Sequence, residues 1–537
     1  MGFQRFVSKF PGRIPLLLLL FGHPAFAGTG SFDVIAFEGQ QAPGLPAGVV
    51  FDDDFGIPVV NAQGRIAFRA RLQNPRVDSI WVFDPDSGLH AVAVEDDPAP
   101  GGVAGETFGP FSERVIIDDL GNIAFGSNLP GIGPAYFATD DLTVRRVAQT
   151  GMELPNAAAG NSVTLLTNNF FSPFTRSWVF NAGRLAMHVR GVANGDPDGN
   201  PISGVWSERP LPADRQLQVI ARTGADTSFN TISPSIATNR LAETIFTANF
   251  DAGPDERART GVWSEANGGA LTLVVQTSAD AGGDIDFNTF SLVGINTNGQ
   301  GVFNASFTTP NGIFTTGVFL QSFEASFPVV VNQQPAPGLE DFEFVTPRTD
   351  IVSGGGQVAI NAGAVPAAGG SPFVRGLWAF RNSGLEAVAI TGDPAPGVQG
   401  GPVFNIGGND LFEPVINREA DLAFLAQLLD ETGTGVGDGI WAECDGVPGK
   451  VVALGDEIVL PNGQSIELTG AGGLRLFGRT GNEDGRPSGF SDRGTVVFRA
   501  EEVAGEAAIV RVETRIPSVF ASGFEPGEDN MPAFCPE

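Results

Sequence analysis

The sequence has little positive charge and almost no lysine. Its 537 residues include 31 Lys and Arg against 61 Asp and Glu, which gives a formal net charge of −30, and the only lysines are Lys9 and Lys450. A chain this acidic repels the phosphates of nucleic acids and anionic membrane surfaces. We therefore expect no nucleic acid among its partners.

Side chains that commonly act as catalytic bases or nucleophiles are also scarce. The chain has three His, one Tyr and two Cys. The sequence contains no nucleophile elbow, phosphate-binding loop, dinucleotide fingerprint or Cys/His metal cluster. Lyase chemistry needs a Tyr, His or Lys beside a carboxylate, and a catalytic cysteine needs a nearby His, so both are poorly supplied. The composition favours a protein without enzymatic activity.

Long apolar runs are missing, and the one short run belongs to a targeting segment. Residues 5–13 carry three basic side chains, residues 14–21 (IPLLLLLF) are apolar, and residues 25–27 (AFA) place small side chains before a cleavage site. This layout predicts a secretory signal peptide over residues 1–27. The run is far shorter than the ~20 residues that span a bilayer. We expect a soluble, exported protein without a membrane span, periplasmic or extracellular, with 28 basic and 61 acidic residues and a net charge of −33 after cleavage.

The two cysteines, Cys444 and Cys535, would both reach a compartment that permits disulfides. A Cys444–Cys535 bond would tie the C-terminal tail, residues 515–537, to the body of the protein. The alternative is a buried free thiol at one position and a loose tail at the other. Sequence spacing does not decide between them, because it does not show proximity.

Glycine and proline are in excess, and the excess marks a repeat. The 72 Gly and 39 Pro make up about a fifth of the chain, against roughly 12% in average proteins. A hydrophobic content of 42%, with 43 Phe, is too high for a disordered chain. We therefore interpret the Gly and Pro residues as turns that separate many short structural elements.

An eight-residue phrase occurs eight times along the chain. Its clearest copy is residues 61–68 (NAQGRIAF), in which a polar residue is followed by a small residue and then by a small and a large apolar residue. The copies centre on Gly64, Gly121, Gly183, Ala242, Gly299, Gly356, Ala420 and Gly494, at steps of 57, 62, 59, 57, 57, 64 and 74 residues. The copy at Gly183 has its Asn displaced by one place. Near-even spacing of this kind indicates an array of repeats.

The sequence pattern of each repeat predicts four short strands. The Asn-x-x-Gly turn suits a hairpin, and the alternation of apolar residues after Gly64 is typical of a strand. A Gly-Ile-Trp-like strand follows, as at Ile80 and Trp81, then a strand such as residues 89–94, and then a Pro-Ala-Pro-Gly turn such as residues 98–101. No segment shows a sustained helical period, so we expect few helices. Four strands in roughly 60 residues match one blade of a β-propeller.

The two ends of the chain predict that the ring of blades is closed. Residues 32–37 have the pattern of a fourth strand without the three that precede it. The eighth repeat has three strands, through residues 510–512, and no clear fourth. Closure would also remove exposed sheet edges, which an open stack would leave. We predict an all-β protein in which residues 28–514 form a closed β-propeller of eight four-stranded blades, with the N-terminal strand completing the last blade.

The Asn-x-x-Gly-x-x-Ala-Phe phrase, the Gly-Ile-Trp-like strand and the Ala-Pro-Gly turn resemble those of bacterial exported tandem-repeat proteins, the NxxGxxAF or choice-of-anchor family. The resemblance covers about residues 32–512. It implies an exported protein with a C-terminal surface anchor and no established activity. This chain departs from the family because it lacks a C-terminal apolar helix with basic stop residues. Its residues 519–525 (VFASGFE) are similar to a short ending of some secreted proteobacterial proteins, which favours release or a periplasmic location.

If the strands run outward from the axis, the loops after the second and fourth strands share one face, where propellers usually bind ligands. Asp196, Asp198 and Asn200 on one such loop have the alternating oxygen ligands of a short Ca²⁺ loop. The distal bidentate Glu is missing, so a solvated polar turn is the competing interpretation. Ca²⁺ is the only cofactor that the sequence suggests. Other acids on these loops are Asp251, Asp255, Glu256, Asp430, Glu431 and Asp438.

Two functions fit these observations. The first is a non-catalytic binding or interaction module whose ligand is a protein or a glycan. The second is a secreted carbohydrate-active hydrolase that uses Asp/Glu pairs near the propeller channel. Two carboxyl groups ~5 to 10 Å apart in a cleft would favour the hydrolase. The repeated Trp residues could stack on sugars, but their fixed place in each repeat indicates that they belong to the core.

Overall fold

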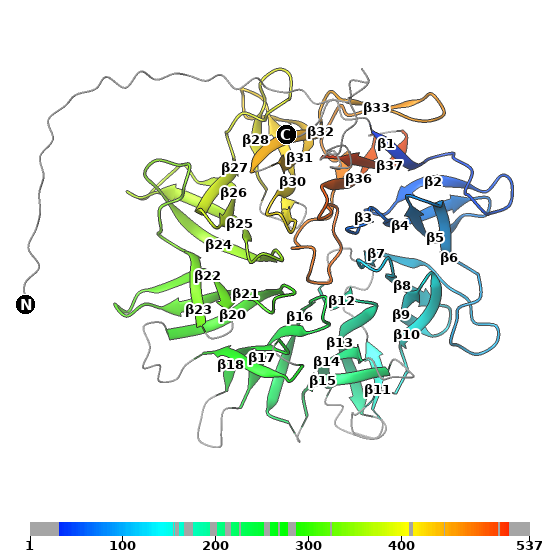
Figure 1. Ribbon diagram of the computed structural model, residues 1–537, viewed down its shortest axis with the longest axis horizontal. Helices are drawn as coiled ribbons and strands as arrows, with labels where there is room; N and C mark the ends of the chain where they lie inside the picture. Colours follow the sequence, from blue (N-terminus) through cyan, green and yellow to red (C-terminus); the bar gives the residue numbers. More distant parts are fainter. Residues whose placement is uncertain are drawn as a thin grey trace, which may run out of the picture.

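Eight β-sheets surround a common axis in the computed structural model of the chain, and each forms one blade of a closed β-propeller (Figure 1). The structure describes residues 32–153, 155, 161–165, 176–193, 201–209, 216–224, 227–251, 258–266, 269–277, 286–322, 325–407, 412–444, 446–502 and 505–514. No α-helix occurs in these ranges. The eight-bladed all-β prediction is confirmed. The predicted signal peptide and C-terminal tail lie outside the described residues.

The strands of each blade follow one another in sequence from the axis outward, apart from those of the last blade. Blade 1 contains β2 (Val50–Phe55), β3 (Val59–Val60), β4 (Ile66–Gln73), β5 (Val77–Asp84) and β6 (Gly88–Val94). Blade 2 contains β7 (Phe111–Ile117), β8 (Ile123–Leu129), β9 (Gly133–Asp140) and β10 (Thr143–Gln149). Blade 3 contains β11 (Asn161–Leu165), β12 (Trp178–Asn181), β13 (Arg184–Ala193), β14 (Pro201–Arg209) and β15 (Gln216–Arg222). Blade 4 contains β16 (Phe229–Thr238), β17 (Thr244–Phe250), β18 (Arg259–Ser264) and β19 (Thr272–Gln276).

The second half of the chain repeats this order. Blade 5 contains β20 (Asp286–Ile295), β21 (Gly301–Thr308), β22 (Phe314–Ser322) and β23 (Ala325–Val331). Blade 6 contains β24 (Phe342–Val352), β25 (Val358–Pro366), β26 (Val374–Arg381) and β27 (Gly384–Ile390). Blade 7 contains β28 (Val403–Asn405), β29 (Val415–Ile416), β30 (Leu422–Leu429), β31 (Gly435–Cys444) and β32 (Val447–Ala453), and a hairpin of β33 (Glu457–Val459) and β34 (Ser465–Glu467) follows it. Blade 8 contains β35 (Leu474–Arg475), β36 (Thr495–Glu501), β37 (Ala507–Glu513) and β1 (Asp33–Phe37).

The two ends of the chain build blade 8 together. Strand β1 pairs antiparallel with β37, with Val34 opposite Val510 and Phe37 opposite Ala508. Arg511 forms an ion pair with Asp33 at the start of this ladder, at 2.5 Å. The predicted ring closure by the N-terminal strand is therefore confirmed.

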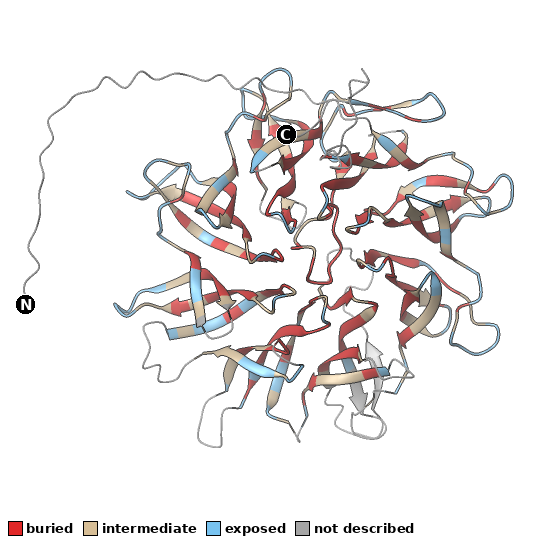
Figure 2. Ribbon diagram, viewed as in Figure 1, coloured by how far each residue is buried: buried red, intermediate tan, exposed pale blue. Residues whose placement is uncertain are grey.

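The hydrophobic core lies inside and between the blades (Figure 2). Trp378 and Trp441, on the third strands of blades 6 and 7, have no exposed surface. Their indole N–H groups donate to the carbonyl oxygens of Pro337 and Pro396 in the Ala-Pro-Gly turns, at 2.9 and 3.1 Å. Each tryptophan thus packs in the core and holds the turn that leads into its own blade, as their fixed place in the repeat predicts.

Candidate functional site

A segment of blade 8 fills the axis of the ring. After β35 the chain leaves the blade, runs to the middle of the ring and returns to β36 (Figure 1). We call residues 476–493 the central segment. It lies within the longest step between repeat copies, the 74 residues from Ala420 to Gly494. The propeller channel, where the hydrolase hypothesis places its acids, is thus occupied by the chain itself.

Asp350 on β24 is the centre of a buried charge cluster at the axis. Its side chain is 1% exposed and contacts three guanidinium groups. Arg486 of the central segment places Nη1 2.7 Å from Oδ2, and Arg479 places Nε 3.2 Å from Oδ1. Arg176 contributes a contact of 2.9 Å from blade 3. A carboxylate neutralised in this way is a poor general acid, base or nucleophile.

Burial and neighbouring charges together set the pKa values of the groups around Asp350. Burial works against the charge of Arg486, yet Asp350 and Asp484 hold the pKa of this guanidinium above its usual value. Burial raises the pKa of the Asp484 carboxyl, and the neighbouring Arg486 opposes that rise. Burial, together with the charge of Arg486, lowers the pKa of Arg114 to about 9. The buried carboxylates and guanidinium groups at the axis therefore stabilise one another in their charged forms.

A second cluster joins the central segment to the Asn-x-x-Gly turns. Arg240, in the turn of blade 4, contacts Asp492 at 2.8 Å and Glu483 at 3.4 Å, both in the central segment. The same guanidinium contacts Asp119 of blade 2 at 2.5 Å. Burial raises the pKa of Asp119, and Arg240 counteracts that effect. Three carboxylates therefore gather here, and each of them contacts the same guanidinium.

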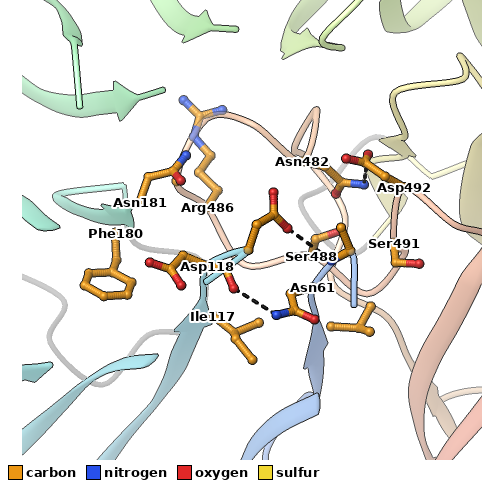
Figure 3. A pocket seen from close by; sticks show the side chains of 14 residues that line it. Asn61, Ile117, Asp118, Phe180, Asn181, Asn482, Arg486, Ser488, Ser491 and Asp492 are labelled. Carbon is orange, nitrogen blue, oxygen red and sulfur yellow. Dashed lines mark hydrogen bonds between the residues drawn. The ribbon is translucent and has the colours of Figure 1, made fainter. Parts of the chain in front are cut away.

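A small cavity separates the central segment from the inner turns of blades 1, 2 and 3 (Figure 3). Its walls include Asn61, Asp118, Asn181, Arg486 and Ser488. The volume that a water-sized sphere can enter is about 20 Å³, which is room for about one water molecule. A sugar ring does not fit, so this cavity offers no substrate site for a glycosidase.

Most of the sequence-predicted site residues lie outside the part of the chain that the structure describes. Asp196, Asp198 and Asn200, the candidate Ca²⁺ ligands, lie outside the described residues, as do Asp255, Glu256 and Cys535. Cys444 is the last residue of β31. Because Cys535 lies outside the described residues, the Cys444–Cys535 bond stays a prediction. Among the described residues, no group of three His, Cys, Asp or Glu side chains is arranged to hold a metal ion.

Two of the described loop acids, Asp430 and Asp438, have structural contacts of their own. Asp430 accepts the backbone N–H groups of Thr432 and Thr434 at 2.8 and 2.9 Å and so closes its own turn. Asp438 is buried in β31 and accepts the N–H of Gly472. Burial raises the pKa of Asp438. These two acids are therefore part of the scaffold.

Sequence reasoning missed the residues that occupy the axis. Arg486, Asp350 and Arg240 lie far apart in the sequence, and although Arg240 occupies a variable position of the repeat phrase, no motif marks the three as a cluster. The available signal was the last repeat step, 74 residues where the shortest steps are 57. The extra residues between the copies at Ala420 and Gly494 form the hairpin of β33 and β34 and the central segment.

A sequence profile of a family of unknown function (DUF7453) matches residues 25–95 and 75–510. No curated protein matches the chain. No helix of the described residues has the length and apolar character that crossing a membrane requires.

Solved structures similar to this chain are distant. The β-propeller domain of the Trilobed protease from Pyrococcus furiosus is 8% identical, with a TM-score of 0.34 over 76% of this chain and 97% of that one. The WD40 domain of SCAP from fission yeast is 10% identical, with a TM-score of 0.37 over 90% and 98%. An α-L-arabinanase from Penicillium chrysogenum is 11% identical, with a TM-score of 0.25 over 62% and 96%. The blade count accordingly depends on the sheets of this chain alone.

Proposed function

We propose that this chain, which belongs to the family of unknown function DUF7453, is an exported β-propeller that binds a protein or glycan ligand and catalyses no reaction. The observation that supports the proposal is that the axis of the ring is filled and its carboxylates contact arginine. Its carboxylates Asp350, Asp484 and Glu483 contact arginine, and the central segment fills the space around them. A hydrolase needs a carboxyl pair with room for a substrate between them.

The ligand would bind on the face that carries the loops after the second and fourth strands. The loops between β21 and β22 and between β25 and β26 lie there and contain no charged residue. Ile313, Phe314 and Phe373 on or beside these loops are 53%, 66% and 51% exposed. The guanidinium of Arg375 lies 5.2 Å from the Phe373 ring centroid. Exposed aromatic side chains beside an arginine are typical of binding surfaces in proteins.

Export, calcium and family membership are part of the same proposal. The leader-like residues 1–27 support secretion, and the eight copies of the repeat phrase support membership of the NxxGxxAF repeat proteins. Calcium would bind at Asp196, Asp198 and Asn200. The Cys444–Cys535 disulfide would hold the tail, and release or a periplasmic location would follow cleavage of the leader.

A panel of polysaccharides and secreted proteins tests the proposal when each is assayed for retention and for cleavage, with and without Ca²⁺. We expect retention of at least one ligand and cleavage of none. Phe314→Ala and Phe373→Ala should weaken retention, whereas Val459→Ala, which is 62% exposed in the β33–β34 hairpin, should not. Cleavage of any substrate would overturn the non-catalytic proposal and favour the carbohydrate-active hydrolase.

A further inference from the structure

We propose that the central segment is an axial lock, which holds the ring closed by binding the inner strands of blades on all sides of the axis. It differs from the closing ladder of β1 and β37, which joins the two ends of the chain at one blade only. We call the β1–β37 ladder of blade 8 the seam. The lock also belongs to blade 8, so it ties the blade that contains the seam directly to the blades opposite.

Backbone amides at one position of the repeat bind the central segment. The residue just before the motif Asn donates its N–H to a carbonyl oxygen of the segment in four blades. These bonds are Val60 to Ser488 at 2.8 Å, Phe180 to Gly485 at 2.9 Å, Thr238 to Asp484 at 3.0 Å and Ile416 to Thr480 at 3.1 Å. Successive amides of a strand point to opposite sides, and in blades 1, 4 and 7 the next amide, that of the motif Asn, bonds across its own turn. The amide before it therefore faces the axis, where the segment supplies the acceptor.

Side chains of the segment bind blades 5 and 6, two of the three blades that this set of amides leaves out. Arg486 donates to the carbonyl oxygen of Val293 in blade 5 at 2.6 Å and to Asp350 in blade 6 at 2.7 Å. Glu483 accepts the N–H of Thr297 in blade 5 at 2.9 Å. The segment is thus bonded to blades 1, 3, 4, 5, 6 and 7 while it remains part of blade 8.

Glycine lets the segment approach the inner strands closely. A Cβ atom on Gly481 would lie 1.8 Å from the carbonyl oxygen of Val352 in blade 6, and one on Gly478 would lie 1.8 Å from that of Glu413 beside blade 7. Both distances are far inside van der Waals contact. Any other residue at either position would push the segment away from the blade it touches.

The position of the lock couples its bonds to the seam. The ladder between β1 and β37 contains four paired positions, and a ladder this short frays readily by itself. If blade 8 moved away from blade 1, the central segment would have to break its bond to Val60 of blade 1 and its bonds to the blades across the axis in the same movement. We therefore expect the ring to open only when the axial bonds and the seam break together.

Hydrogen exchange on the mature full-length protein tests the lock without any variant. Peptides that contain the amides of Val60, Phe180, Thr238 and Ile416 should exchange at a common slow rate, and the peptide covering β1 should share it. The lock is wrong if the four amides exchange at unrelated rates, or if β1 exchanges freely while they stay protected.

Two substitutions then test the mechanism. Arg486→Met removes the hydrogen bonds of this side chain to Val293 in blade 5 and Asp350 in blade 6, and Gly481→Ala forces the segment away from Val352. Each should speed exchange at all four amides and at β1 by roughly ten-fold or more. Arg76→Met is the control, because Arg76 is 69% exposed in a surface ion pair, and it should change nothing. Faster exchange confined to the blade next to the substitution, or no change, would overturn the proposal.

Discussion

The side-chain amide of Asn61 donates a hydrogen bond of 2.9 Å to the carbonyl oxygen of Asp118, the residue 57 positions later that begins the same turn in the next blade. The Asn61 Oδ1 atom accepts the N–H groups of Gln63 and Arg65, both at 3.0 Å. One side chain therefore closes its own hairpin and ties two blades together. The same blade-to-blade bond joins Asn181 to Thr238, Asn239 to Asn296, and Asn296 to Ser353.

Asn61→Asp should destabilise the ring by about 1–3 kcal/mol at neutral pH, because it leaves a buried carboxylate facing a carbonyl oxygen. The loss should shrink as pH falls, since the protonated carboxyl can donate the missing hydrogen bond. Urea unfolding of both proteins at pH 7 and pH 4.5 measures the free energy of unfolding. Asn462→Asp is the control, because Asn462 is exposed and closes only its own turn. Equal effects of the two substitutions would contradict the blade-to-blade role.

Glu443→Ala should cost about 3–5 kcal/mol, because it removes the buried partner of Arg381 and the acceptor of the Leu422 N–H, which lies 2.9 Å away. Glu443 lies on β31 and Arg381 on β26, so the pair joins blades 6 and 7. Glu386 contacts the same Arg381 at 3.2 Å, but its side chain is 44% exposed. Glu386→Ala should therefore cost at most about 1 kcal/mol. Thermal or urea unfolding of the two variants would decide, and similar losses would count against the importance of the buried pair.

The protein should lose stability as pH falls from 6.5 towards 4, and His188 should account for part of that loss. Burial, with a contribution from Arg190, lowers the pKa of His188 to about 4. The unfolded chain, with an ordinary pKa near 6.5, binds the proton first, so the neutral histidine stabilises the fold above pH 6.5 and that stabilisation disappears as pH falls towards 4. The effect is on the order of 3 kcal/mol.

His188→Gln should flatten the dependence of the unfolding free energy on pH across this window. His90→Gln should not, because His90 bonds only to the exposed Ser87 of its own hairpin. An unchanged slope in His188→Gln would show that other groups cause the acid sensitivity.

The mature protein should begin at Gly28 and should carry the Cys444–Cys535 disulfide. Intact mass after expression with the native leader should show loss of residues 1–27 and of two further hydrogens. Reduction should restore those hydrogens, and a non-reducing peptide map should contain one cross-linked pair. Alkylation of both cysteines without reduction would refute the bond, and a full-length mass would refute the cleavage.

The irregular repeat copy at Gly183 shows how much of the fold the local sequence predicts. Asn181 stands one place nearer to Gly183 than the repeat requires, and the turn there has two central residues, Ala182 and Gly183, with φ of 51° and 69°. The shortened turn still lets Asn181 bond to the next blade. Turn chemistry is local, so a one-residue shift in the pattern corresponds to a one-residue change in the hairpin.

The sequence alone determined the blades, their number and the closure of the ring, because each blade uses the same turns, strands and tryptophan positions and its core is made largely of residues near one another in the chain. Only the tertiary structure decided what occupies the axis. Arg486 and Asp350 are 136 residues apart, and the residues next to them in the sequence do not indicate a contact at the axis. Ion pairs between distant segments leave no periodic signal, so the closed channel became visible only once the ring had brought those segments together.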